Sequence, residues 1–351
     1  MTEQTDNNVL SPDTDGPLLQ VHGLDVTYGR SRMRGGDVKA VRGVDLTMGR
    51  GETVGLVGES GSGKSTIGSA VLGLVPTTGG TITFDGVDIT HSTRADRRLL
   101  ARRMQVVFQD PYGSMNPAHT IGDTLAEALR YNLGLSGDEI RERVLRALDD
   151  VGLPPGAARR YPAAFSGGQR QRIAIARALV MEPEFVVCDE AVSALDLSVQ
   201  AQVLNLLARL KQTRGLSYLF ISHDLSVVRY LSNTIVVLYA GRVVERGPAA
   251  LVADSPAHPY TRALLASAPV PDPVAQRLRQ AERRLAAAAT PATGRVSEGC
   301  AFAPRCPFAQ ETCWSTQPEL VEHDGVAVAC HRRDEIAAGA ALPGHATAGA
   351  A

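Results

Sequence analysis

The sequence predicts an α/β fold built on a parallel sheet with crossover helices. Three observations support this: short β-rich runs alternate with helical patterns from residue 18 to about residue 250, the runs are nearly continuously apolar, and one of them precedes a phosphate-binding pattern. Strands covered on both faces need apolar side chains on both sides. The expected core strands are 53–57, 104–108, 185–188, 218–221 and 235–238.

Composition excludes several classes of protein. The 351 residues carry 36 Lys and Arg against 37 Asp and Glu, so there is no global basic field for nucleic acid. No apolar stretch approaches the roughly 18 to 20 residues of a membrane-spanning helix. Residues 1–17 are polar and acidic without Lys or Arg, which predicts a disordered leader with no secretory signal, and hence a cytosolic compartment.

The sequence also predicts helical segments and a linker outside these core strands. Apolar residues from Val199 to Leu210 recur at helical spacing after Asp196 and Ser198, either of which suits a helix N-cap. Residues 121–152 are helical in pattern with no strand between, which predicts a helical insertion. After Gly247 prolines accumulate, and an Ala-, Thr- and Pro-rich stretch at 281–293 is typical of a linker.

A phosphate-binding loop follows the first core strand. Gly58 to Ser65 (GESGSGKS) fits G-x-x-x-x-G-K-[ST], and a helical pattern starts at Thr66. The glycines, Gly58, Gly61 and Gly63, let backbone N–H groups, including that of Ser60, converge on phosphate oxygens. Lys64 would reach the terminal phosphates and the Ser65 hydroxyl would ligate Mg²⁺.

A second carboxylate-bearing strand completes the expected metal site. Asp189 stands where the strand 185–188 leaves the sheet, as a Walker-B aspartate that holds Mg²⁺ would. The adjacent Glu190 is the candidate general base that polarises the attacking water.

A further glycine-rich helix start lies downstream. Phe165 is followed by Ser166, Gly167, Gly168 and Gln169 just before a helical run that stops at Pro183. One bound nucleotide needs only one such phosphate-binding helix start. The second helix start therefore predicts a head-to-tail dimer, in which it faces a nucleotide bound by another chain.

Taken together, these motifs resemble an ABC-transporter ATPase subunit over about 230 residues. The resemblance implies a P-loop NTPase with a RecA-like core, an ABC β-subdomain and a helical subdomain at about 110–180. It also implies two ATP molecules sandwiched between paired domains. The resemblance implies that Gln109 is the Q-loop residue that reaches Mg²⁺ and the attacking water, and that residues 193–196 form the D-loop. It implies that His223 is the switch histidine on the γ-phosphate and that Tyr28 stacks on adenine.

Other segments narrow the resemblance to the oligopeptide/dipeptide/nickel importer ATPases. These are residues 108–117 (FQDPYGSMNP), the stretch DLSVQAQVL from Asp196, His258-Pro259-Tyr260-Thr261, and the cysteine-bearing tail. The resemblance to the second of two paired subunits implies a heterodimer with a related ATPase. It also implies two membrane permeases, an extracytoplasmic binding protein and a place at the cytoplasmic face of the membrane. Ala191 departs from the Pro usual after the Walker-B Glu, but it removes no reacting group.

Four of the five cysteines, Cys300, Cys306, Cys313 and Cys330, fall in one C-terminal segment. Stable disulfides are disfavoured in the cytosol. Zinc sites usually bring short C-x₂₋₄-C pairs, which are absent here. Four thiolates without that pairing, with Pro307 next to Cys306, fit a [4Fe–4S] cluster better, and the resemblance implies the same for some members of the family, while a zinc site and reduced thiols in a small folded appendage stay open. Cys188, on a core strand, is expected to be an apolar filler.

The predicted function is ATP hydrolysis that energises solute import, with ATP closing the dimer and hydrolysis reopening it. Peptides are the default solute, with nickel or another small solute as the alternative. A soluble ABC ATPase of DNA repair or translation is disfavoured because the chain has one P-loop and no long coiled coil, and a regulator without turnover is disfavoured by Glu190 and His223. The expected organisation is a leader 1–17, an ATPase domain 18–250, a C-terminal extension 251–335 and a disordered tail 336–351.

Overall fold

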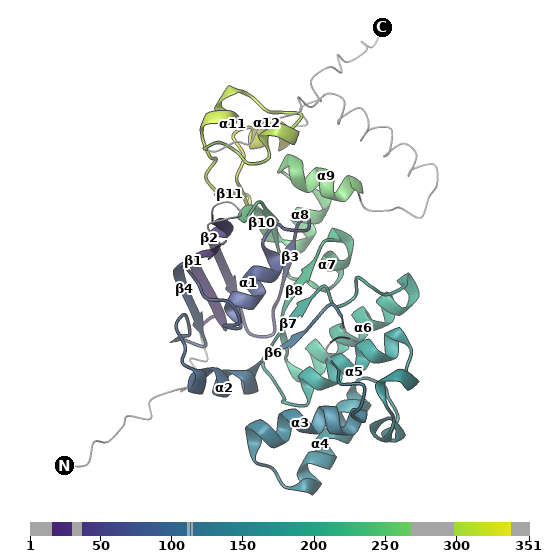
Figure 1. Ribbon diagram of the computed structural model, residues 1–351. Helices are drawn as coiled ribbons and strands as arrows, with labels where there is room; N and C mark the ends of the chain where they lie inside the picture. The colour runs from purple at the N-terminus through teal and green to yellow at the C-terminus, as the bar shows by residue number, and fades with distance from the viewer. Residues whose placement is uncertain (1–15, 30–36, 111–112, 114, 268–297, 338–351) are drawn as a thin grey trace, which may run out of the picture. The chain divides into compact units, whose positions relative to one another are not determined.

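The computed structural model describes residues 16–29, 37–110, 113, 115–267 and 298–337 (Figure 1). The chain divides into two compact units that are each discontinuous in sequence. The first holds residues up to 53 together with 65–221, and the second holds 54–64 together with everything from 222. The predicted boundary near residue 250 therefore falls inside the second unit.

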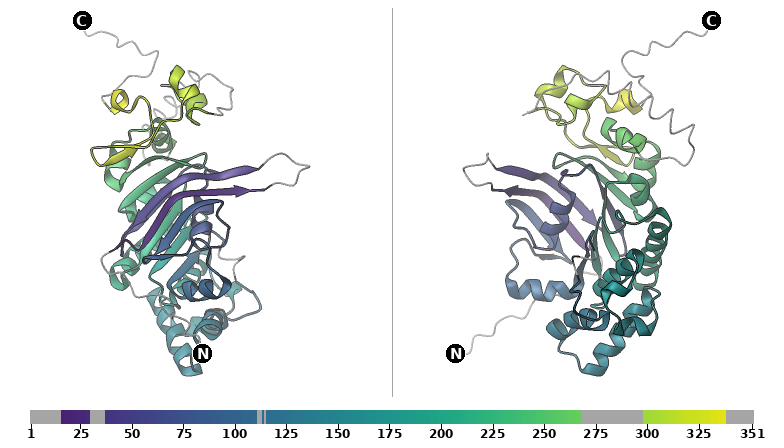
Figure 2. Two further views of the ribbon diagram at one scale, coloured as in Figure 1. Left: turned by 90° about the vertical axis from the view of Figure 1, so that its left-hand side faces the viewer. Right: turned by 45° about the vertical axis from the view of Figure 1, so that its right-hand side comes forward.

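An antiparallel sheet opens the first unit. Its strands in the described chain are ordered β2 (Val38–Met48), β1 (Leu19–Tyr28), β4 (Gly79–Phe84) and β5 (Val87–Asp88). Figure 2 shows β1 and β2 running together as a long ribbon. Along β2 the side chains of Val41, Val44, Leu46 and Met48 are fully buried while their neighbours are exposed, the alternation expected of a sheet with one covered face.

Three further described strands of the first unit pair with one another in parallel. In order they are β6 (Met104–Val107), β7 (Phe185–Asp189) and β8 (Ser217–Ser222). Every residue of β8 is buried, and so are the first four of β7. The apolar runs of β7 and β8 therefore correspond to strands covered on both faces, as predicted, whereas Gln105 and Val106 in the middle of β6 are partly exposed.

Helices make up the rest of this unit. They are α1 (Lys64–Val71), α2 (Arg94–Arg103), α3 (Ile121–Leu133), α4 (Gly137–Asp150), α5 (Gly167–Leu179) and α6 (Leu197–Arg214), with single 3₁₀ turns η1 (Pro155–Arg159) and η2 (Pro162–Ala164). Figure 1 shows α3 and α4 side by side near α5. The predicted helical insertion is confirmed, because between β6 and β7 the described residues contain no strand.

Local sequence sets where these helices begin. Asp196 is the N-cap of α6, and its carboxylate accepts hydrogen bonds from the N–H groups of Ser198 and Val199 at 3.1 and 3.0 Å. The hydrogen bonds to Ser198 and Val199 hold the pKa of Asp196 below its usual value. Capping boxes also open α2 at Thr93, α4 at Ser136 and α5 at Ser166.

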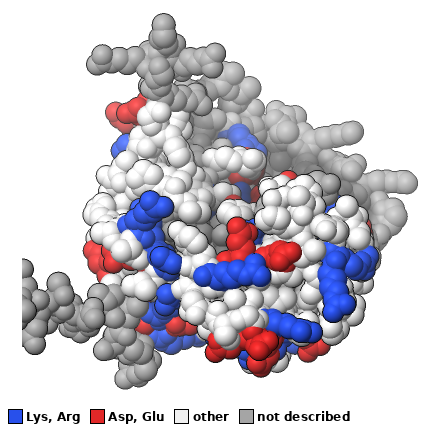
Figure 3. All heavy atoms as spheres, turned by 60° about the horizontal axis from the view of Figure 1, so that its bottom comes forward, with Lys and Arg blue, Asp and Glu red and all other residues white. Residues whose placement is uncertain are grey.

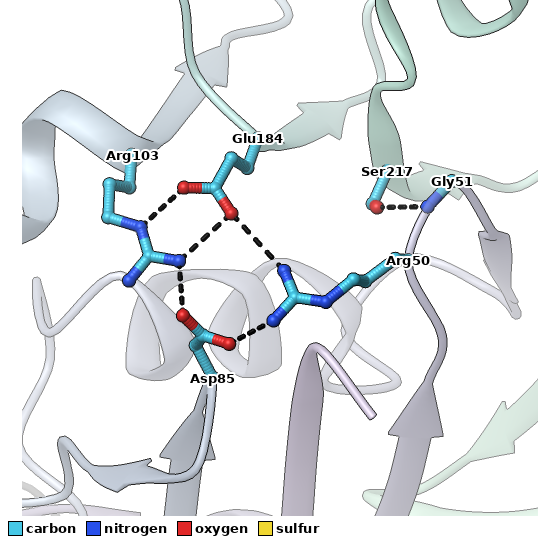
Figure 4. Close-up of polar contacts among 6 residues, drawn as sticks. All are labelled: Arg50, Gly51, Asp85, Arg103, Glu184 and Ser217. Atoms are coloured by element: carbon cyan, nitrogen blue, oxygen red, sulfur yellow. Dashed lines mark hydrogen bonds and ion pairs between the residues drawn. The ribbon is translucent and has the colours of Figure 1, made fainter. Parts of the chain in front are cut away.

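A cluster of charges around the buried Asp85 connects separate parts of the first unit (Figure 4). Asp85 follows β4, and its side chain is completely buried between Arg50 and Arg103. Arg103 Nη2 lies 2.5 Å from Asp85 Oδ2 and 2.9 Å from Oε2 of Glu184, which precedes β7, and Arg103 Nε lies 2.5 Å from Glu184 Oε1. The cluster thus joins the ends of the antiparallel sheet to the starts of β6 and β7.

The second unit consists of one sheet and short helices. In order its strands are β11 (Val321–His323), β12 (Val326–Val328), β10 (Arg242–Pro248), β9 (Thr234–Tyr239) and β3 (Thr53–Val57). Only β9 and β3 pair in parallel within this set. The helices described are α7 (Leu225–Leu231), α8 (Ala249–Asp254), α9 (Pro259–Ser267), α11 (Glu311–Ser315), α12 (Arg333–Ala337) and the turn η3 (Ala303–Arg305).

Residues 1–15 of the expected leader and residues 338–351 of the expected tail lie outside the described residues. Ile336 is completely buried in α12, so the folded C-terminal part extends past the predicted boundary at residue 335. In the described part of the chain, every helix is too short or too polar to span a bilayer. Lys, Arg, Asp and Glu are interspersed on the face drawn in Figure 3, in line with the balanced charge.

Candidate functional site

The phosphate loop belongs to the second unit and follows β3. A Cβ at Gly58 would lie 2.3 Å from the carbonyl oxygen of Leu238, so only glycine fits there. Gly61 and Gly63 have φ angles of 80° and 104°, which favour glycine. Ser60 and Gly61 are exposed at the outer edge of the loop. The loop therefore has the backbone that the sequence pattern predicts.

The side chain of Lys64 binds the backbone of the phosphate loop. Its side chain is buried, and Nζ donates to the carbonyl oxygens of Gly58 at 2.7 Å and Glu59 at 2.9 Å. The hydroxyl of Ser62 is buried with no hydrogen-bond partner in the described chain. A buried ammonium that donates to carbonyl oxygens of the loop, beside such a hydroxyl, suits an anionic ligand.

The first unit brings together two of the three predicted Mg²⁺ ligands, Ser65 and Asp189. Ser65, in the first turn of α1, donates its hydroxyl to Asp189 Oδ1 at 2.8 Å, although 124 residues separate them. A hydroxyl and a carboxylate are hard oxygen ligands of the kind that Mg²⁺ prefers. These residues therefore fit the ion that the sequence implies.

Glu190 has an unusual backbone. Its φ is 48°, in the left-handed region that non-glycine residues rarely adopt. Its N–H donates to Ile221 O at 3.0 Å, and its carbonyl accepts from the backbone N–H of Ser193 at 3.1 Å and from its hydroxyl at 3.0 Å. Ala191 is buried directly after it. This backbone holds Glu190 at the end of β7 without the proline that the resemblance leads one to expect.

Tyr28 lies at the end of β1. Its side chain is 42% exposed, and its hydroxyl lies 3.4 Å from Oγ1 of Thr66 in α1. An exposed ring close to the helix that follows the phosphate loop is available for stacking.

The second glycine-rich helix start is an ordered N-terminus. Ser166 caps α5: its hydroxyl accepts from the N–H of Gln169 at 3.3 Å, and Gln169 Oε1 accepts from the N–H of Ser166 at 3.1 Å. A Cβ at Gly168 would lie 2.3 Å from Val199 of α6, whereas one at Gly167 would meet nothing within 4 Å. The two glycines therefore differ, since Gly168 permits tight helix packing and Gly167 leaves the helix start open.

Gln109 is exposed just after β6. It lines a pocket of about 150 Å³ in the first unit together with Gly167, Arg170, Ala191 and Ala194, among others. The predicted Q-loop residue, the start of α5 and the segment after Glu190 thus share one cavity. His223 is exposed after β8 and belongs to the second unit, where Asp224 caps α7 by accepting from Ser226 N–H at 2.8 Å.

The cysteines differ in their surroundings. Cys188 is fully buried in β7, and burial raises the pKa of its thiol to about 12, as an inert apolar filler requires. The four C-terminal cysteines line one cavity of about 10 Å³, the volume of roughly one water. Burial raises the pKa of Cys306 to about 12 and that of Cys330 to about 11.

The cysteine set does not fit a metal cluster as it stands. Within the described residues, no group of three or more His, Cys, Asp or Glu side chains is arranged to hold a metal ion. All four thiols are free. The four thiols nevertheless share one cavity, and the choice among the three alternatives stays a prediction.

Three residues near the phosphate loop escaped the sequence analysis. Glu59 is a variable position of the loop pattern, and it contacts Tyr260 and Arg305 of the C-terminal part. The signals were the motif His258-Pro259-Tyr260-Thr261 and the run Arg305-Cys306-Pro307 of the cysteine-bearing tail, which carried a resemblance but no role.

Comparisons with known proteins identify the family of the chain. Residues 41–193 match the ABC transporter family, and residues 244–313 match the oligopeptide/dipeptide transporter C-terminal region. A protein of Brucella ovis named as a peptide import ATP-binding protein is 48% identical over 310 residues, 88% of this chain and 95% of the relative. A Brucella abortus protein named likewise is 49% identical over 295 residues, 84% of this chain and 86% of the relative.

Solved structures match as well. The protein cbiO1 of Clostridium perfringens, part of the ABC transporter complex cbiONQ, superposes with a TM-score of 0.60 at 30% identity, over 68% of this chain and 91% of that one. The ATP-binding cassette MJ0796, in a dimeric post-hydrolysis state bound to ADP and phosphate, superposes with a TM-score of 0.59 at 27% identity, over 66% of this chain and 98% of that one. The chain therefore belongs to the ABC transporter ATPases, in the branch that carries the oligopeptide/dipeptide transporter C-terminal region.

Proposed function

We propose that the protein is the ATP-hydrolysing subunit of an ABC importer for peptides. Membership of the family makes it an ATPase coupled to transport. The single observation that carries the catalytic part is the 2.8 Å hydrogen bond between Ser65 and Asp189, which pairs the phosphate-loop hydroxyl with the carboxylate at the end of β7. Peptide import is supported by the C-terminal region match and by the names of the relatives.

Each residue of the site would have one task. Gly58, Ser60, Gly61, Gly63 and Lys64 would bind the phosphates through N–H groups and one ammonium, and Thr66 and Tyr28 would flank the nucleotide. Ser65, Asp189 and Gln109 would hold Mg²⁺, which neutralises charge on the phosphates. Glu190 would accept a proton from the attacking water, and His223 would contact the terminal phosphate.

A second copy of the fold would complete the site. Ser166, Gly167, Gly168 and Gln169 form a glycine-rich helix start that the chain's own phosphate loop does not require, which supports a head-to-tail dimer with a related ATPase. Closure on ATP and reopening after hydrolysis would be passed to two membrane permeases, served by an extracytoplasmic binding protein. The chain would then work at the cytoplasmic face of the membrane.

Glu190→Gln tests the catalytic assignment in the assembled complex. The variant keeps the shape of the side chain but loses the base, so phosphate release should fall by about 100-fold or more while ATP still binds. Glu142→Gln on exposed α4 makes the same chemical change away from the site and should leave turnover intact. Hydrolysis retained in Glu190→Gln would refute the general-base role.

Transport is tested in proteoliposomes that hold the co-purified permeases. Phosphate release should rise when binding protein loaded with a dipeptide or oligopeptide is added, and peptide should accumulate. Stimulation by nickel but by no peptide would replace the peptide assignment and leave the ATPase assignment standing. The membrane proteins and the second ATPase that co-purify with the chain would identify the partners.

A further inference from the structure

The C-terminal part of the second unit contacts the phosphate loop at Glu59. Arg305 places two nitrogens on the Glu59 carboxylate, with Nη1 2.8 Å from Oε2 and Nη2 2.8 Å from Oε1. The backbone N–H of Glu59 donates to the hydroxyl of Tyr260 at 2.7 Å. One loop residue is therefore bound through both its backbone and its side chain by residues 201 and 246 positions further along the chain.

Tyr260 is rigidly held. It is completely buried in α9, and its ring lies 4.6 Å from that of Tyr239 and 5.4 Å from that of Phe302, centroid to centroid. Its backbone N–H donates to His258 Nδ1 at 3.0 Å, and the N–H of His258 in turn donates to the buried Glu245 at 3.0 Å. The motif beginning at His258 thus fixes the position of the Tyr260 hydroxyl.

Arg305 is supported by the same aromatic group. It ends the turn η3, where its N–H donates to Phe302 O at 2.9 Å. Its guanidinium lies 5.7 Å from the ring centroid of Phe302 and 6.0 Å from that of Tyr239. Tyr260 and Arg305, the two residues that contact Glu59, therefore both lie against the rings of Tyr239 and Phe302.

The charges explain why such a contact matters. A carboxylate inside a phosphate-binding loop repels an anionic ligand. The hydrogen bond from Arg305 is the largest of the effects that hold the pKa of Glu59 below its usual value, and the charges of Arg305 and Lys64 add to it. Glu59 is thus ionised, and the cation that compensates it comes from the C-terminal region.

We propose that Arg305 and Tyr260 are positioning residues for ATP. Arg305 neutralises Glu59, and Tyr260 fixes the backbone of the phosphate loop. The affinity for ATP then depends on how the C-terminal region is seated. This inference rests on the proposed ATPase function and assigns the C-terminal region a task in nucleotide binding.

The direction in which each substitution changes the Kd for MgATP distinguishes an electrostatic role of Arg305 from a purely structural one. Arg305→Gln exposes the Glu59 charge and should raise the Kd for MgATP about two- to fivefold, the range expected for a partly exposed ion pair. Glu59→Gln removes the repelling charge and leaves Arg305, so it should lower the Kd. The double variant should return toward the Kd of the wild type, and Arg305→Lys should restore part of the loss.

Tyr260→Phe tests the backbone contact, since it removes one hydroxyl from a side chain that stays buried. It should raise the Kd without changing its salt dependence, whereas the effect of Arg305→Gln should shrink at high salt. Arg229→Gln is the matched control, and it should leave the Kd unchanged. Arg229 pairs with Asp254 in the same unit, and its side chain is 51% exposed, against 52% for Arg305.

Titration of the full-length protein with a fluorescent ATP analogue gives the Kd, and phosphate release from the assembled complex gives KM and kcat. The expected result is a change in KM at nearly constant kcat. Equal weakening by Arg305→Gln and Glu59→Gln, or no change in either, would overturn the inference. A wild-type protein that binds no ATP would instead refute the proposed function.

Discussion

The buried carboxylate of Asp85 offers the sharpest test of what holds the first unit together. Its side chain has no exposed area and accepts from Arg50 and Arg103. Asp85→Asn keeps the volume but turns an amide toward two guanidinium groups. Breaking a buried ion pair costs about 3 to 5 kcal/mol. Because Arg50 is one-third exposed and Arg103 keeps Glu184, we expect about 3 kcal/mol.

Thermal unfolding followed by far-UV circular dichroism measures this loss. A loss of about 3 kcal/mol corresponds to a melting temperature lower by roughly 6 to 12 °C for a unit of this size. Glu142→Gln, whose partner Arg146 lies 4.0 Å away in an exposed pair, should change stability by less than about 0.5 kcal/mol. An Asp85→Asn variant that melts with this control would refute the importance of the cluster.

The effect has a predicted pH dependence. Burial alone would raise the pKa of Asp85, but the hydrogen bonds and charges of Arg103 and Arg50 outweigh it, so the pKa of the folded state lies below the ordinary value of 3.8. A depressed folded pKa stabilises the fold above the unfolded pKa, and this contribution is lost as the pH falls through the folded pKa. The difference in the free energy of unfolding between the wild type and Asp85→Asn should therefore be largest at neutral pH and should decrease below about pH 4. A gap that is constant with pH would contradict the electrostatic explanation.

Three further predictions concern packing, a buried histidine and the thiols. Gly168→Ala should destabilise by about 1 to 3 kcal/mol in urea because its Cβ meets Val199 at 2.3 Å, whereas Gly167→Ala should not destabilise. Burial lowers the pKa of His258 to about 3, so the second unit should lose about 1.4 kcal/mol of stability per pH unit below about pH 6.5, seen in the fluorescence of the single Trp314 and abolished in His258→Gln. The four C-terminal cysteines should react as thiols in unfolded protein purified without oxygen, and iron with acid-labile sulfide at four atoms per chain would contradict their placement.

Much of the nucleotide site could be predicted from residues adjacent in sequence. The phosphate loop, the capping box at Ser166 and the Asp189-Glu190 pair are local patterns whose backbone follows from glycine, cap and strand preferences. The left-handed φ of Glu190 was not predictable, because a non-glycine residue adopts it only when surrounding contacts impose it. The arrangement of the cysteines was not predictable either, since their spacing of five, six and sixteen residues fits several sites.

The sequence by itself determined the elements and the chemistry of ATP hydrolysis, because strand and helix periodicity and the loop motifs each depend on a few neighbouring residues. Only the tertiary structure decided which distant residues control them. Arg305 contacts Glu59 across 246 positions, and Arg103 contacts Glu184 across 81. Such pairs leave no local pattern in the sequence, because an Arg or Glu is expected to be exposed unless it is paired. The partner comes from a distant part of the chain and is known only from the fold.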